Sequence, residues 1–195
     1  EFHREGLDDR IVEYLNMWTR EPRMPGWEEL NERVRSRTEK VNIAVVGKYV
    51  RLTDSYKSLN EALEHGGIFN DVNVNRVFVD ADELVGKDDL APFFENIDGI
   101  LIPGGFGERG TEGKILAAGY ARRNRIPFFG ICLGMQLAVT EFSRSLCSLT
   151  SANSKEFDPD TPDPVIDYLP GQKNITRKGG TMRLGAYECT IEPGT

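Results

Sequence analysis

The feature that most restricts how this chain can fold is an alternation of short apolar runs with longer helical patterns, from Val41 to about Thr150. The predicted strands cover residues 41–47, 72–79, 97–102 and 126–131, and the predicted helices cover 55–65, 115–123 and 133–145. The run at residues 41–47 is nearly continuous and ends in a glycine, as expected of a strand buried on both faces. Alternating strands and helices predict a parallel sheet with helices on both faces, whose sites form at the carboxyl ends of the strands.

The flanking segments read differently from this alternation. Residues 1–40 predict a helix, a turn at Pro22 and Pro25, and a second, highly charged helix. We interpret them as the tail of a preceding domain with its linker, and residues 41–195 as the main domain; a helical extension packed on that domain fits equally well. After Thr150 we expect antiparallel strands at 165–169 and 184–191, added at one edge of the sheet.

Composition narrows the functional classes. The 195 residues carry a net charge of −7, which gives no general attraction to nucleic acid or anionic membranes, and no apolar run approaches the length of a membrane helix. Three cysteines without a CxxC pair argue against a disulfide framework or a zinc site, and favour a reducing, cytoplasmic compartment. The first residue, Glu1, is not an initiator methionine, so we expect a piece of a longer chain.

The clearest catalytic signal is the run Gly130-Ile131-Cys132-Leu133-Gly134, which lies between a predicted strand and a predicted helix. This is the setting of a nucleophile elbow, in which a strained turn exposes the nucleophile at the top of a sheet. The helix N-terminus there favours a thiolate. A buried structural cysteine is the alternative. Cys147 and Cys189 have no such setting, and we interpret both as structural.

A second signal is the glycine turn Pro103-Gly104-Gly105-Phe106-Gly107, which follows the strand before the elbow strand. Such a turn can direct the Gly105 N–H at the carbonyl oxygen that a thiolate attacks. With the Leu133 N–H it would form an oxyanion hole. Taken alone, the turn is equally consistent with a tight connection, with or without phosphate affinity, and the chain contains no P-loop.

Several motifs together resemble the class I glutamine amidotransferase domain of the CTP synthase family. The matching motifs are residues 46–49, 56–63, 103–107, 130–136, 153–157 and 179–185. The elbow is shared by all class I amidotransferases, whereas the Gly179–Gly185 run with the motif around Glu156 is much more specific to CTP synthases. The resemblance implies a flavodoxin-like three-layer α/β sandwich, with residues 7–40 ending the synthetase domain and forming the interdomain linker.

The resemblance also implies roles for individual residues. Cys132 would attack the side-chain amide of glutamine, form a glutamyl thioester and release ammonia. Gly105 and Leu133 would donate to the oxyanion, Gln136 would hold the substrate, and Glu156 would bind its α-amino group. The family also needs a histidine base and a glutamate after the cysteine, but no histidine follows Cys132. We therefore expect these residues alone to be inactive or weakly active.

Partners and cofactors are also implied by the resemblance. The synthetase domain would aminate UTP to CTP with ATP and magnesium, GTP would activate the enzyme, and the full-length protein would form a homotetramer. No metal or cofactor site is expected in these residues. A different class remains open: a redox sensor similar to ThiJ/PfpI proteins, or a binding domain that retains a reactive elbow cysteine.

Overall fold

A computed structural model describes residues 2–3, 5–18, 25–48, 56–168 and 190–194. The chain consists of two compact units, residues 1–37 and residues 38–195. The first unit contains helix α1 (Leu7–Tyr14) and helix α2 (Pro25–Ser36), so Pro25 begins a helix and does not lie in the predicted turn. Proline is tolerated at that position because the first helical N–H has no intrahelical acceptor.

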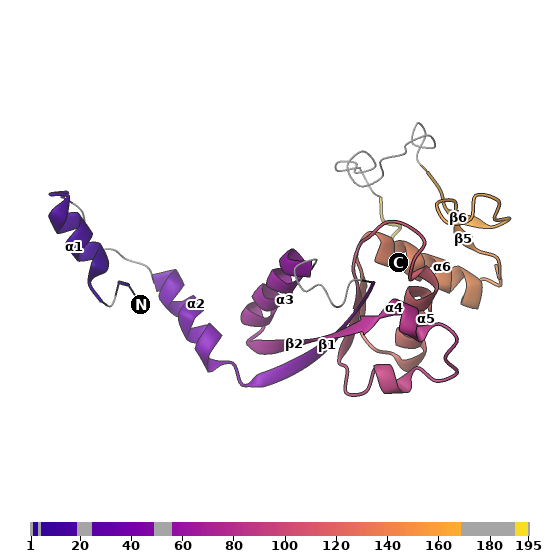
Figure 1. Ribbon diagram of the computed structural model, residues 1–195, viewed down its shortest axis with the longest axis horizontal. Coiled ribbons are helices and arrows are strands. Elements are labelled where there is room, and N and C mark those ends of the chain that lie inside the picture. The colour runs from indigo at the N-terminus through magenta and orange to yellow at the C-terminus, as the bar shows by residue number, and fades with distance from the viewer. Residues whose placement is uncertain (1, 4, 19–24, 49–55, 169–189, 195) are drawn as a thin grey trace. The chain divides into compact units, whose positions relative to one another are not determined.

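The second unit contains a four-stranded parallel sheet in the order β2-β1-β3-β4 (Figure 1). Its strands are β1 (Glu39–Gly47), β2 (Val72–Asp80), β3 (Gly99–Ile102) and β4 (Phe128–Gly130). The central strands are the most apolar: β3 is wholly buried, and residues 44–46 of β1 have no exposed surface. This order is the flavodoxin-like one, which confirms the predicted α/β fold class.

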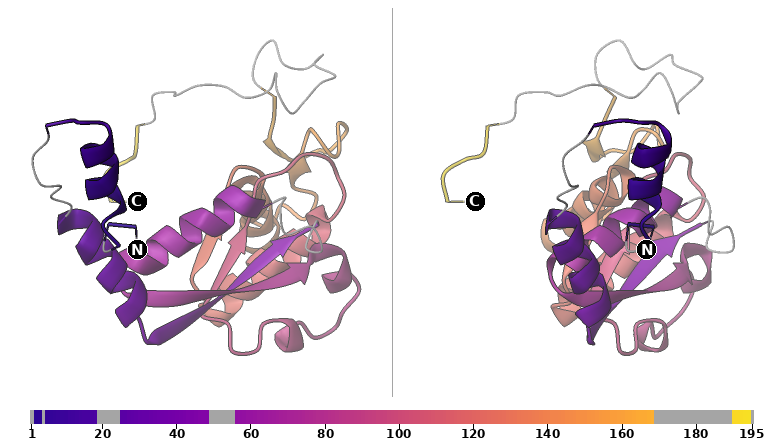
Figure 2. Two further views of the ribbon diagram at one scale, coloured as in Figure 1. Left: turned by 60° about the vertical axis from the view of Figure 1, so that its left-hand side comes forward. Right: turned by 90° about the vertical axis from the view of Figure 1, so that its left-hand side faces the viewer.

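Three longer helices connect or follow these strands: α3 (Lys57–Phe69), α5 (Thr111–Asn124) and α6 (Leu133–Leu146). The crossovers from β1 to β2 and from β3 to β4 run in opposite directions across the sheet. Right-handed connections therefore place α3 on one face and α5 on the other (Figure 2). Short helices α4 (Ala81–Leu84) and η2 (Ala91–Phe93), which the sequence did not predict, lie between β2 and β3.

The sequence predicted that the first long helix ends before Gly66-Gly67, and this was wrong. Helix α3 continues through both glycines to Phe69. Gly67 is buried, and a helix can accept a glycine for about 1 kcal/mol. The chain turns instead at Asp71, whose φ is +57°. His65 thus lies inside the helix rather than at its end.

The strand predicted at residues 165–169 corresponds in part to an observed strand at Pro164–Ile166, but its predicted antiparallel pairing at one edge of the main sheet was wrong. Strands β5 (Asn153–Ser154) and β6 (Pro164–Ile166) pair in parallel and form a separate two-stranded sheet. The intervening loop folds back through local hydrogen bonds, including Thr161 Oγ1 to the Ser151 carbonyl at 2.7 Å. The predicted strand at 184–191 lies largely outside the described residues, and Thr190 and Ile191 are not in a strand.

Candidate active site at the nucleophile elbow

Cys132 occupies a strained turn between β4 and α6. Its φ of +52° and ψ of −109° are rare for a residue with a side chain, and its side chain is exposed. The turn is fixed on both sides: the Ile131 N–H donates to the Ile102 carbonyl of β3 at 2.9 Å, and the Gly134 N–H donates to the Ile131 carbonyl at 2.9 Å. The backbone therefore presents the thiol at the carboxyl edge of the sheet and at the N-terminus of α6.

The two glycines that flank this turn permit close backbone contacts. A Cβ atom on Gly134 would lie 2.2 Å from the carbonyl oxygen of Ile102, and one on Gly130 would lie 2.5 Å from the backbone of Gly134 and Met135. Neither space can accept a methyl group without movement of the backbone. Both glycines are therefore required by the elbow.

The glycine turn after β3 lies directly beside the elbow. A Cβ atom on Gly104 would be 3.4 Å from the Cβ of Cys132, and one on Gly105 would be 3.8 Å from Cδ2 of Leu133. Leu133 is the first residue of α6, where N–H groups lack intrahelical acceptors. The structure thus brings together Cys132, Gly105 and Leu133, the three residues that the sequence predicted for nucleophile and oxyanion hole.

Glu156 also reaches this region from a distant part of the sequence. Its Oε1 accepts a hydrogen bond from the Gly107 N–H at 3.4 Å, and its own N–H donates to Ser154 Oγ at 3.2 Å. The next residue, Phe157, packs against the buried side chains of Ile115, Leu133 and Leu137. The β5 segment therefore holds the Glu156 carboxylate beside the glycine turn.

Gln136 lies in the first turn of α6, and its side chain is partly buried. Its N–H donates to the Cys132 carbonyl at 3.1 Å, which continues the helix from the elbow. Its own carbonyl accepts from Thr140 Oγ1 at 3.2 Å.

His65, the one histidine of the second unit, is not placed to act as a base for Cys132. His65 is exposed on α3, which packs against β2, and β2 and β4 are the two ends of the sheet. His3 belongs to the first unit, where it contacts Asp8 at 2.5 Å; this carboxylate raises the pKa of His3.

An ion pair that the sequence did not reveal joins α6 to α5. Arg122 donates two hydrogen bonds to the Glu141 carboxylate, at 2.8 and 2.9 Å, and Glu141 is 95% buried. Arg122, with a smaller contribution from Ser145, lowers the pKa of Glu141 despite the opposing effect of burial. Residues 122 and 141 lie on different helices, so no spacing rule along one helix could have paired them.

Cys147 does not have the buried setting expected of a structural cysteine. It caps the C-terminus of α6 and is exposed. Cys132 and Cys147 therefore lie at opposite ends of one helix. Cys189 and the Gly179–Gly185 run lie outside the described residues.

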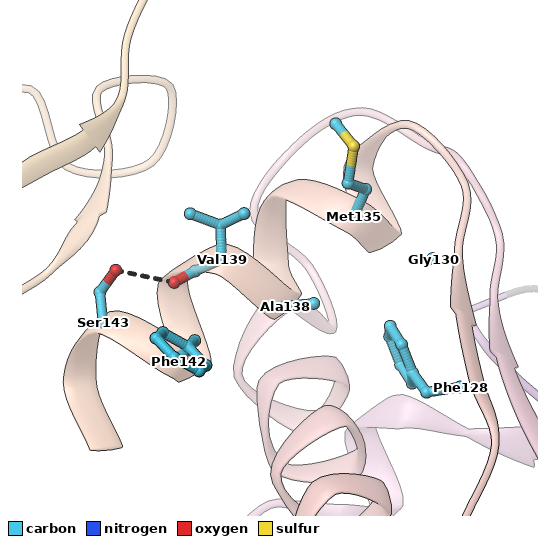
Figure 3. Close-up of a pocket in the computed structure, with 7 residues that line it drawn as sticks. All are labelled: Phe128, Gly130, Met135, Ala138, Val139, Phe142 and Ser143. Atoms are coloured by element: carbon cyan, nitrogen blue, oxygen red, sulfur yellow. Dashed lines mark hydrogen bonds between the residues drawn. The ribbon is translucent and has the colours of Figure 1, made fainter. Parts of the chain in front are cut away.

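An apolar groove of about 430 Å³ lies between β4 and α6, next to the elbow. Figure 3 shows Phe128 of β4 facing α6, with Met135, Val139 and Phe142 along the helix. The one hydroxyl in the lining, that of Ser143, donates to the Val139 carbonyl at 2.8 Å. In the described part of the chain β4 has β3 as its one neighbour, so its other edge is open.

The described residues contain no cluster of three or more histidine, cysteine or acidic side chains arranged to hold a metal ion. Within the same ranges, no helix combines the length and apolar character needed to cross a bilayer.

The fold and the elbow define a class of protein, and a family comparison agrees with them. Residues 51–194 match the family described as glutamine amidotransferase class-I, and the chain belongs to this family. Among curated proteins it is similar to the CTP synthases of Syntrophus aciditrophicus, 59% identical over 97% of this chain, and Geobacter metallireducens, 54% identical over 99%. The chain spans about a third of these relatives, 35% and 36% of their lengths.

A solved structure supports the same relationship. The glutaminase domain of Trypanosoma brucei CTPS, with bound acivicin, is 42% identical with a TM-score of 0.64; the match covers 69% of this chain and 52% of that chain. These findings confirm the resemblance predicted from the sequence. They do not favour the ThiJ/PfpI-like alternative.

Proposed function

We propose that this chain is the glutaminase part of a CTP synthase, which supplies ammonia for the ATP-dependent amination of UTP to CTP. The observation that carries the proposal is the exposed Cys132 sulfur on a strained turn at a helix N-terminus, in contact range of a glycine turn. Cys132 gives its proton to a general base, its sulfur attacks the side-chain carbonyl carbon of glutamine, and the base passes the proton to the nitrogen as the C–N bond breaks and ammonia leaves. Water then hydrolyses the thioester to glutamate.

In this proposal, the neighbouring backbone stabilises the tetrahedral intermediate. The N–H groups of Gly105 and Leu133 donate to the oxyanion, and each donor contributes about 3 kcal/mol in the transition state. Gln136 holds the substrate from the first turn of α6, and the Glu156 carboxylate binds its α-amino group. The position of Glu156 beside the glycine turn supports this role.

We further propose that the general base comes from another part of the full-length protein. Within the second unit the one histidine, His65, lies on α3 beside β2, at the opposite end of the sheet from β4, and the relatives are almost three times as long as the matched region. The open edge of β4 and the apolar groove beside it could accept the segment that carries the base. General acid–base catalysis is worth about 10²- to 10⁴-fold, so these residues alone should release ammonia slowly.

The remaining features of the whole protein are proposals from its relatives. Residues 1–40 would end a synthetase domain and form the linker, and residues 41–195 would belong to the amidotransferase domain. ATP and magnesium would bind the synthetase domain, GTP would activate the enzyme, and a cytoplasmic homotetramer is the expected assembly. No residue of this chain is assigned to those ligands.

Ammonia release from glutamine by the full-length protein tests the proposal. Cys132→Ser should abolish it, because a serine hydroxyl keeps its proton at neutral pH and is a far weaker nucleophile than a thiolate. Cys147→Ser, on the same helix, is the matched control and should leave the rate unchanged. A Cys132→Ser variant that still releases ammonia at the wild-type rate would contradict the proposed function.

A further inference from the structure

Lys48 lies at the point of the sheet where a ligand crevice is expected. It follows the last residue of β1, and the glycine turn follows the neighbouring strand β3. The chain leaves β1 toward β2 on one side and reaches β3 on the other, so the strand order reverses between β1 and β3. In doubly wound sheets, binding sites form at the carboxyl ends of the strands at such a reversal.

One peptide unit of the glycine turn is held at both of its polar ends. The Lys48 ammonium donates to the Phe106 carbonyl oxygen at 2.5 Å, and the Gly107 N–H donates to Glu156 Oε1 at 3.4 Å. The carbonyl of residue 106 and the N–H of residue 107 belong to the same planar peptide group. A cation and an anion therefore fix its orientation from opposite ends.

The turn needs such external contacts because its own sequence restrains it weakly. Three of its five residues are glycines, which have more accessible backbone conformations than any other residue. Gly105 lies one residue before the held peptide, beside the elbow. The Gly105 N–H belongs to the Gly104–Gly105 peptide, two peptide units before the held one, so release of the Phe106–Gly107 peptide would loosen the glycine segment that orients this N–H.

The surroundings of Lys48 favour an orientation of its side chain toward the glycine turn. A Cβ atom on Gly110 would lie 3.8 Å from the Lys48 Cβ, so the stem of the lysine lies close to Gly110, the residue before α5. Behind it, Lys114 is 99% buried, and its pKa falls to about 8, chiefly because of burial and secondly because of the Lys48 charge. Asp82 opposes this shift. Repulsion between the Lys48 and Lys114 ammonium groups disfavours a position of the Lys48 ammonium close to Lys114.

We propose that Lys48 is a positioning residue for glutamine hydrolysis: with Glu156 it holds the Phe106–Gly107 peptide and thereby directs the glycine turn toward Cys132. This inference rests on the proposed function. Lys48 acts through the backbone rather than on the substrate, so its loss should affect the rate of the chemical step more than substrate binding.

The test uses Lys48→Met in the full-length protein, because methionine keeps the stem and removes the ammonium. Misplacement of a catalytic group by about 1 Å can cost about 10²-fold, so we expect kcat for ammonia release to fall about 10- to 100-fold while KM stays within a few-fold. Lys48→Arg should recover part of kcat, since a guanidinium can still donate to the carbonyl. Lys87→Met, which removes an exposed lysine between α4 and η2, is the matched control.

Alkylation of Cys132 by iodoacetamide separates a positioning role from general damage, because this displacement needs no oxyanion hole. Its rate should be unchanged in Lys48→Met, and amide hydrogen exchange of residues 104–107 should be faster. The proposal is overturned by an unchanged kcat, by an increase in KM alone, or by an equal loss of kcat and alkylation. If the wild-type protein releases no ammonia, the proposed function fails, while faster exchange in the variant would still establish the contact with the turn.

Discussion

Replacement of Gly134 by alanine perturbs the elbow at its tightest contact. The new methyl carbon would lie 2.2 Å from the Ile102 carbonyl oxygen and 2.9 Å from its carbon, where ordinary contacts begin at 3.4 Å. The backbone of β3 or of α6 must therefore move by roughly 1 Å. Overpacking of this kind costs about 1–3 kcal/mol, or more where backbone must shift.

The cost of overpacking is partly offset by the better helix propensity of alanine, which contributes about 1 kcal/mol of stability because Gly134 is the second residue of α6. Gly66→Ala measures this term alone, since Gly66 also lies in a helix and a Cβ atom there meets nothing within 4 Å. Each 1 kcal/mol changes the Tm by about 2–4 °C in a chain of this size. We expect Gly66→Ala to raise the Tm slightly and Gly134→Ala to lower it by several degrees.

Activity should respond more strongly than stability. A displacement of about 1 Å at the nucleophile can cost about 10²-fold in rate, so the folded Gly134→Ala protein should lose most glutaminase activity. The assay is ammonia release by the full-length variants, alongside their thermal melting. If Gly134→Ala melts and turns over like Gly66→Ala, the close approach of α6 to β3 does not hold the elbow, and our reasoning is wrong.

Three further predictions concern the same region. Iodoacetamide should alkylate Cys132 roughly 3- to 30-fold faster than Cys147, since the helix dipole favours negative charge at the N-terminus of α6 and opposes it at the C-terminus; equal rates by peptide mapping would reject this. Gly105→Pro, which removes one N–H, should lower kcat by about 10²- to 10³-fold, and a normal kcat would exclude that donor. Because Arg122 lowers the pKa of Glu141 in the folded state, the pair should stabilise the protein above the unfolded pKa of a glutamate and lose that effect as the pH falls through the folded value. Melting curves from pH 7 to pH 3 should therefore show a difference in Tm between wild type and Glu141→Gln that becomes smaller in acid. A difference that stays constant over this range would contradict a stabilising ion pair between Arg122 and Glu141.

Much of the fold follows from local patterns in the sequence. Strands β1, β3 and β4 are short apolar runs, β2 alternates valines with polar residues, and helix α6 has an amphipathic pattern, so each was predictable without knowledge of its partners. Helix α5 is buried over much of its surface and has a weak periodic pattern, and the sequence predicted only residues 115–123 of it. The predictions were wrong where contacts between distant segments determine the end of a helix or the partner of a strand. Helix α3 passes through two glycines that usually end a helix, and the strands after Thr150 pair with each other instead of with the sheet.

The candidate site divides in the same way. Cys132 and its flanking glycines form a continuous motif whose chemistry depends on a local turn, so the sequence identified them. Lys48 and Glu156 lie 58 and 49 residues from their partners in the glycine turn, and only the folded sheet brings them together. Cys147 was interpreted as a structural cysteine, but it is exposed. The sequence could not show this, because the burial of a helix residue depends on which other segments pack around the helix.

The most direct test of the central claim is detection of the covalent intermediate. The full-length protein is mixed with glutamine, quenched in acid and digested, and the peptides are examined by mass spectrometry. We expect a γ-glutamyl thioester on the peptide that contains Cys132, absent from Cys132→Ser and present in Cys147→Ser. A glutamyl adduct on another residue, or steady ammonia release by Cys132→Ser, would contradict the assignment of Cys132 as the nucleophile.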